Sequence, residues 1–151
     1  MRYGSIYLVV RDFERSLDFY EKVLDMRVSA VNGTRFAMFD NGGLNICLMN
    51  GYYDVQNEEK VIRRGQYYPE YDDLHVIADR ENSKKAFINL GVPDLEAEYT
   101  RIKNLGIAAG LTPIRFIQVF SPYWYFTFQD PDGNPIEVTG GYAGAGPGQP
   151  G

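Results

Sequence analysis

The chain has 151 residues, a length that suits one compact domain or two small halves that share a core. With one histidine and one cysteine, it cannot build a disulfide framework or a Cys/His-rich zinc or iron site within one chain. A net charge of −5 argues against binding to nucleic acid. The sequence lacks a run of about 18 apolar residues and the layout of a signal peptide, so we expect a cytoplasmic protein without a membrane segment.

Hydrophobic periodicity in the first fifty residues predicts one strand, one helix and three more strands. Residues 5–10 alternate between two faces, as in a strand, and Asp12 then occupies a helix N-cap position. Apolar residues at spacings of four, three and four predict an amphipathic helix over residues 13–24. Three further strands are expected, separated by Asn-Gly turns, at residues 28–31, 35–39 and 44–49.

The same order of elements returns in the second half of the chain. A strand over 88–92 and a capping residue at Asp94 lie 82 residues after their counterparts, and a helix over 95–105 follows. Further on the offset is 90, because Asp130 matches Asp40. Strands are expected at 114–120, 123–129 and 135–139. The sequence therefore predicts a βαβββ module over 1–50, a linker over 51–83, a second module over 84–141, and a flexible Gly/Pro-rich tail over 142–151.

The linker is longer than most connections and holds five of the twelve tyrosines. Aromatic residues in a polar segment indicate that it packs over a cleft mouth or a second subunit, or that it folds back on its own chain. A short helix is expected around residues 56–64.

The duplicated unit, the segment LVVRDFERSLDFYEKVLDM (8–26) and the segment FTFQDPDGNPIEV (126–138) resemble the vicinal oxygen chelate superfamily. This superfamily includes glyoxalase I, extradiol dioxygenases and bleomycin-resistance proteins. The resemblance implies a single α+β domain over 1–141, in which two tandem βαβββ modules form a curved eight-stranded mixed sheet around a cleft. It also implies a homodimer, in which modules can be exchanged between subunits.

The resemblance further implies where a metal would be held. In metal-binding members a histidine lies seven residues before the capping aspartate of a module, and a carboxylate lies on the last strand. The matching positions here are Ser5, Cys47, Phe87 and Glu137. Phe87 has no donor atom, so these residues do not make a metal site of the usual kind, and neither a metal nor another cofactor is expected.

The densest aromatic run, residues 123–128, is expected to place alternate side chains in the cleft. Glu137 should face the same way, because Ile136 and Val138 belong to the core, and it is the candidate catalytic acid or base. An aromatic cleft suits a planar ligand, although these rings could equally pack a core or a dimer interface. The expected ligand-binding residues are Tyr7, Arg35, Phe39, Asn45, Cys47, Phe87, Asn89, Tyr123, Tyr125, Thr127 and Glu137.

Three functions remain open from the sequence. The first is metal-free binding of a small planar, and given the acidic surface cationic, organic molecule, as in sequestration or drug resistance. The second is a lyase, isomerase or dioxygenase that uses Glu137 or an atypical metal site. The third is a dimeric, non-catalytic interaction module.

Overall fold

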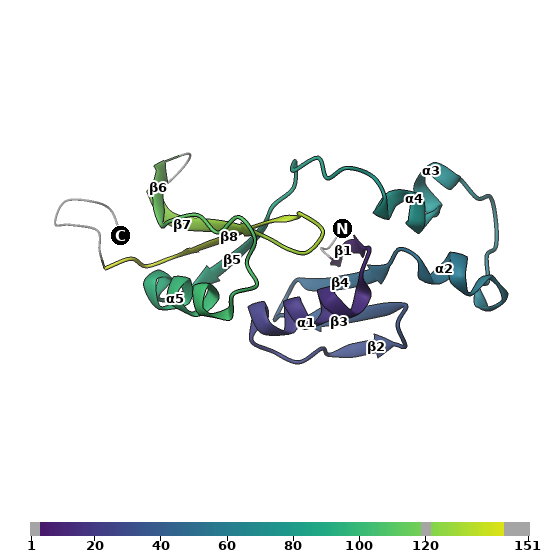
Figure 1. The fold of residues 1–151 in the computed structure, drawn as a ribbon, viewed down its shortest axis with the longest axis horizontal. Coiled ribbons are helices and arrows are strands. Elements are labelled where there is room, and N and C mark those ends of the chain that lie inside the picture. Colours follow the sequence, from purple (N-terminus) through teal and green to yellow (C-terminus); the bar gives the residue numbers. More distant parts are fainter. Residues whose placement is uncertain (1–3, 119–121, 144–151) are drawn as a thin grey trace. The chain divides into compact units, whose positions relative to one another are not determined.

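The computed structural model describes residues 4–118 and 122–143. The chain divides into two compact units, Met1–Glu81 and Asn82–Gly151, and each unit holds one βαβββ module (Figure 1). The predicted α+β class and the tandem βαβββ modules are confirmed. Each module forms its own four-stranded mixed sheet, so the eight strands belong to two hydrogen-bonded sheets. The extent of the single domain over 1–141 stays a prediction. Of the predicted tail, residues 144–151 lie outside the described residues.

The first sheet has the strand order β1-β4-β3-β2, with β1 and β4 parallel and the other neighbours antiparallel. The Asp12 carboxylate accepts a hydrogen bond from the Arg15 backbone N–H at 3.1 Å, which confirms the predicted N-cap of the helix α1. The helix ends at Asp25, which adopts the left-handed conformation with φ 51°. The elements of this module are β1 (Ser5–Val10), α1 (Phe13–Leu24), β2 (Ala30–Asn32), β3 (Phe36–Asp40) and β4 (Asn45–Asn50).

The core of the first unit lies between α1 and one face of the sheet. Tyr20 of α1 is 1% exposed, and its ring centroid lies 6.4 Å from that of Phe39 on β3. Phe39 pairs with Ile46 and Ala37 pairs with Leu48, and all four side chains are buried. This inward set fixes which side chains of β3 and β4 lie on the opposite, open face.

The linker folds back on its own chain, within the first unit, which is one of the arrangements expected for it. Instead of one helix around 56–64, it forms short helical turns. At its start, the Gly51 N–H donates to the Val10 carbonyl at 2.9 Å, and a Cβ on Gly51 would lie 2.5 Å from Cβ of Ala78. Only glycine therefore allows α4 to pack this closely on β1. The turns are α2 (Tyr53–Gln56), η1 (Glu58–Lys60), α3 (Pro69–Asp72) and α4 (Leu74–Ala78).

The second sheet repeats the topology of the first, with the order β5-β8-β7-β6 and a parallel β5–β8 pair. The Asp94 side chain caps α5 by accepting from the Ala97 N–H at 3.0 Å, and Gly106 ends the helix at φ 67°, both as predicted. The elements are β5 (Ile88–Val92), α5 (Leu95–Leu105), β6 (Arg115–Gln118), β7 (Pro122–Gln129) and β8 (Pro135–Gly140). No helix in the described part of the chain is long and apolar enough to cross a membrane.

The strand pairing shows that the two modules do not keep one constant offset. Ile46 corresponds to Ile136, 90 residues later, but its partner Phe39 corresponds to Phe128, 89 residues later. The turn before β8 is therefore one residue longer than the turn before β4. A one-residue slip exchanges the two faces of a strand, so the 90-residue offset assigns the faces of β3 wrongly.

Candidate functional site

The open face of the second sheet gathers most of the predicted site residues of that unit. Phe126 and Phe128 are 0% and 1% exposed, and the ring of Phe126 meets Tyr99 of α5 edge-on at 5.3 Å. Because side chains alternate along β7, Tyr125 and Thr127 lie on the face away from the helix. Trp124 lies on the helix side, as predicted, where its ring is 4.9 Å from Tyr142.

Glu137 lies in the middle of this open face. On β8 it is directly opposite Thr127 of β7 on one side and Asn89 of β5 on the other. The Asn89 side-chain amide donates to Oε1 of Glu137 at 2.8 Å, which holds the carboxylate in place. Phe87 precedes β5 and is 57% exposed. Glu137 therefore lies on the face away from the helix, and its Oε2 accepts no hydrogen bond from the described residues.

Aromatic rings and one guanidinium extend the face toward β6. The rings of Tyr123 and Tyr125 have centroids 5.6 Å apart. The Arg115 guanidinium lies 4.9 Å from the centre of the Tyr125 ring, and its Nη2 donates to Thr127 Oγ1 at 3.1 Å. Two effects raise the pKa of the Tyr123 phenol above its ordinary value: partial burial, which is the larger, and the negative charge of Glu137. The phenol therefore stays neutral, and can donate a hydrogen bond, throughout the physiological range.

The predicted residues of the first unit lie on its own sheet, with different surroundings. Tyr7 is 59% exposed, and its ring centroid lies 6.4 Å from that of Phe36. Asn45 donates to the Met38 sulfur at 3.6 Å. Cys47 pairs with Tyr7 and Met38 on the neighbouring strands and is only 1% exposed, so its thiol is a buried side chain.

Two predicted residues lie elsewhere than expected. Phe39 is fully buried against α1 and does not line the open face, because the turn before β4 is one residue shorter than its counterpart. Arg35 lies in the turn before β3, and its Nε is 3.0 Å from Oδ1 of Asp54 in the linker. Its guanidinium therefore joins the turn before β3 to the linker by an ion pair.

Sequence reasoning missed two residues of the open faces. Arg115 was assigned to a strand but not to a face, although its pairing with Tyr125 places it beside that ring. Phe36 is the residue of β3 that corresponds to Tyr125, whereas the 90-residue offset assigned that position to Arg35. Antiparallel pairing counted back from each turn would have found both, provided that the turn lengths were known.

The residues at the four family metal positions do not fit a metal. Ser5 carries a hydroxyl and pairs with Asn45, Cys47 is buried, and Phe87 has no donor atom. Glu137 is the one carboxylate of the set. In neither unit do the described residues gather three His, Cys, Asp or Glu side chains that could hold an ion. His75 lies in α4, where its Nδ1 is 2.7 Å from Asp73.

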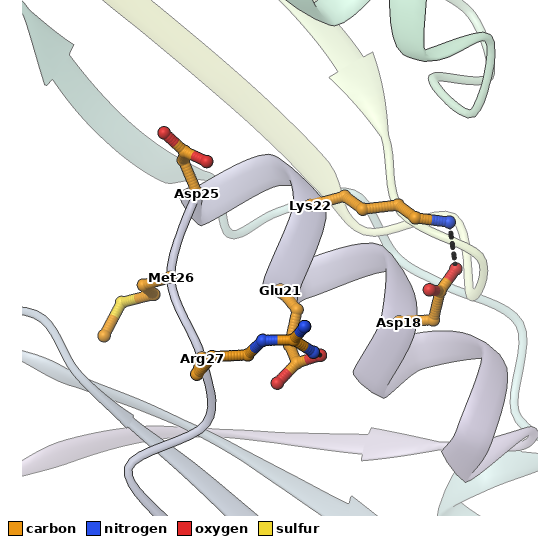
Figure 2. A pocket seen from close by; sticks show the side chains of 6 residues that line it. All are labelled: Asp18, Glu21, Lys22, Asp25, Met26 and Arg27. Carbon is orange, nitrogen blue, oxygen red and sulfur yellow. Dashed lines mark hydrogen bonds and ion pairs between the residues drawn. The ribbon is translucent and has the colours of Figure 1, made fainter.

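Two pockets are lined entirely by residues of the first unit. One, of about 420 Å³, lies between the sheet and the linker. It is lined by Asn32, Arg35, Phe36, Met49, Asp54, Tyr71, Asp72 and Leu74. The other, of about 500 Å³, lies at the end of α1 (Figure 2), where Lys22 pairs with Asp18 at 2.7 Å and Arg27 with Glu21 at 3.0 Å. Four of its five charged side chains form two surface ion pairs with each other, so it is not a candidate site.

Comparison with known families agrees with this topology. Residues 2–138 match the family model of the Glyoxalase/Bleomycin resistance protein/Dioxygenase superfamily. The chain belongs to this superfamily. The superfamily description covers both enzymes and resistance proteins, so membership alone does not select an activity.

A relative and several solved structures of similar fold match nearly the whole chain. The Bacillus subtilis (strain 168) protein named "Uncharacterized protein YraH" is 26% identical over 141 residues, which are 91% of this chain and 97% of that protein. A glyoxalase/bleomycin resistance protein/dioxygenase from Nocardioides has a TM-score of 0.66 at 21% identity, covering 100% of this chain and 90% of that chain. A lactoylglutathione lyase from Agrobacterium tumefaciens has a TM-score of 0.56 at 16% identity, covering 93% and 92%. These two structures show that the superfamily fold is shared.

Proposed function

We propose that this superfamily member binds a small planar organic molecule on the open face of its second sheet, without a metal. The observation that carries the proposal is the pair of rings, Tyr123 and Tyr125, on the same sheet face as the Glu137 carboxylate. Aromatic walls with a few fixed polar groups are typical of sites for small organic ligands. Resistance proteins are named in the superfamily description, and sequestration is the role that such a face suits.

The chemistry of the face favours a ligand with a positive charge. Glu137 receives one hydrogen bond from Asn89 on Oε1 and leaves Oε2 available to a ligand donor. A carboxylate that accepts a hydrogen bond from a cationic group forms a stronger bond than one between neutral groups. The tyrosine rings can add cation–π attraction for the same kind of ligand, as the Tyr125 ring already does for Arg115.

Proflavine, a planar aromatic cation, serves as a first probe, with binding followed by fluorescence anisotropy. Wild type should bind it, and Tyr123→Ala and Tyr125→Ala should each weaken binding about tenfold through lost stacking. Tyr71→Ala is the matched control, because Tyr71 is 73% exposed in the linker of the other unit. Binding that is equal in all four proteins, or absent from wild type, would contradict the proposal.

A catalytic role for Glu137 is the second candidate. Glu137 on β8 and Tyr123 on the neighbouring strand β7 lie on the same face of the sheet, so a carboxylate and a phenol are both presented to a ligand there. Turnover that persists after chelator treatment but is lost in Glu137→Gln would support this role. Stoichiometric iron, zinc, nickel or manganese in the gently purified protein would favour a metal-dependent lyase or dioxygenase instead.

We further propose that the protein is a homodimer, as the resemblance implies. Sedimentation equilibrium tests this directly, because one chain has a mass of 17.2 kDa. A dimer that binds none of the small-molecule probes would favour the third function, a non-catalytic interaction module.

A further inference from the structure

The open face of the second sheet carries two opposite charges that do not pair with each other. Among the described residues, Glu137 has no cationic group within ion-pair distance and is bonded by Asn89 alone. Arg115 likewise has no carboxylate partner there, and its contacts are the Tyr125 ring and the Thr127 hydroxyl. Both charges are therefore available to a ligand.

The strand order explains why these two groups stay apart. Arg115 is on β6 and Glu137 is on β8, with β7 between them. Two strand spacings separate their backbones by about 9.6 Å. Arg115 reaches inward as far as Thr127, which is directly opposite Glu137, so the charged groups are separated by roughly 5–9 Å. One aromatic ring with a substituent at each end spans a gap of this size.

The guanidinium is also held in a defined orientation. Its contact with the Tyr125 ring and the hydrogen bond from Nη2 to Thr127 Oγ1 restrict the side chain at two points. The remaining N–H donors of an arginine can then bind a carboxylate with little further loss of side-chain freedom. A mobile surface arginine lacks this advantage.

We propose that the ligand of this face is dipolar: a planar aromatic molecule with a cationic group that binds Glu137 and an anionic group, such as a carboxylate, that binds Arg115. This inference rests on the proposed function and specifies its ligand class. The two charges must be at opposite ends of the ring. An amino acid with both charges on one carbon is too short to reach both groups.

Three related probes test the inference by ligand-observed NMR titration: 4-(aminomethyl)benzoate, benzylamine and 4-methylbenzoate. The dipolar probe should bind about tenfold more tightly than either singly charged probe, the effect of one added hydrogen bond to a charged group. In Arg115→Gln its advantage over benzylamine should fall to within about twofold. In Glu137→Gln its advantage over 4-methylbenzoate should fall likewise. Lys103→Gln, an exposed change on α5, is the charge-matched control and should keep both advantages.

The outcomes separate this inference from the function on which it rests. If proflavine binds and Tyr123→Ala weakens it, but the dipolar probe binds no better than benzylamine, the dipolar ligand is refuted and the planar site stands. If proflavine and all three probes bind equally to wild type and Tyr123→Ala, both are refuted. An advantage of the dipolar probe that survives in Arg115→Gln also overturns the assignment of Arg115.

Discussion

Asp130 should stabilise the second unit far more than its counterpart Asp40 stabilises the first. The Asp130 side chain is 3% exposed and accepts hydrogen bonds at 2.8–2.9 Å from the backbone N–H groups of Asp132 and Asn134 and from the Asn134 side-chain amide. Asp40 is exposed, and from the described residues its side chain accepts one long bond of 3.3 Å, from Gly42 N–H. The sequence repeat makes the two aspartates equivalent, but their surroundings differ.

The magnitude follows from the three bonds of Asp130. Each contributes about 1–1.5 kcal/mol net to folding, because water can replace part of what is lost in this half-buried turn. Asp130→Ala should therefore lower the free energy of unfolding by about 3–4.5 kcal/mol, a large fraction of a typical total of about 5–15 kcal/mol. Asp40→Ala should cost less than about 1 kcal/mol.

Urea unfolding followed by tryptophan fluorescence is a selective assay, since Trp124, the single tryptophan, lies on β7 of the second unit. Asp130→Asn should fall between wild type and Asp130→Ala, because an amide keeps one acceptor oxygen but presents a donor to the other partner. Far-UV circular dichroism of the same samples reports the helices of both units, so for Asp40→Ala it also detects unfolding of the first unit, which lacks a tryptophan. A midpoint shift for Asp130→Ala no larger than that for Asp40→Ala would refute the reasoning.

Two more predictions concern the second sheet. Gly140→Ala places a Cβ against the Val92 carbonyl oxygen, so it should lower the free energy of unfolding by about 1–3 kcal/mol or prevent folding. Gly91→Ala has open space around it and should change the urea midpoint little. Equal midpoints for the two variants would argue against the pairing of β5 and β8. Because the pKa of Tyr123 is raised in the folded state, its contribution to stability is complete below about pH 10 and is lost as pH rises through the folded value. Glu137→Gln should lower the pKa of Tyr123, because it removes a nearby negative charge. The pKa is measured from phenolate absorbance, with Tyr123→Phe as the reference. An unchanged pKa would show that the charge of Glu137 does not act on the Tyr123 phenol.

Local patterns predicted the order of elements, because each depends on residues close in the sequence. Asp12 and Asp94 cap their helices as expected, and strand alternation assigned Phe126 and Thr127 to opposite faces. The face of Phe39 depends on the exact length of a turn, which composition does not determine. Sequence patterns therefore predicted a feature correctly where it depends on neighbouring residues, and failed where it depends on the length of a turn.

The functional residues divide in the same way. Glu137 could be placed from its two apolar neighbours, whereas the pairing of Arg35 with Asp54 depends on how a long linker folds back. Arg115 requires the register between β6 and β7. Contacts of this kind join residues that are distant in sequence, and no periodic pattern within one segment encodes them.

The extra residue in the turn before β8 sets which positions of the two modules are equivalent. With it, Met38 of the first unit corresponds to Thr127 of the second, and Phe36 corresponds to Tyr125. One duplicated backbone thus presents a polarisable surface of sulfur and phenyl groups and a second surface of hydroxyls and charges. Duplication of one backbone has therefore not duplicated one chemistry, because equivalent strand positions carry different side chains in the two units.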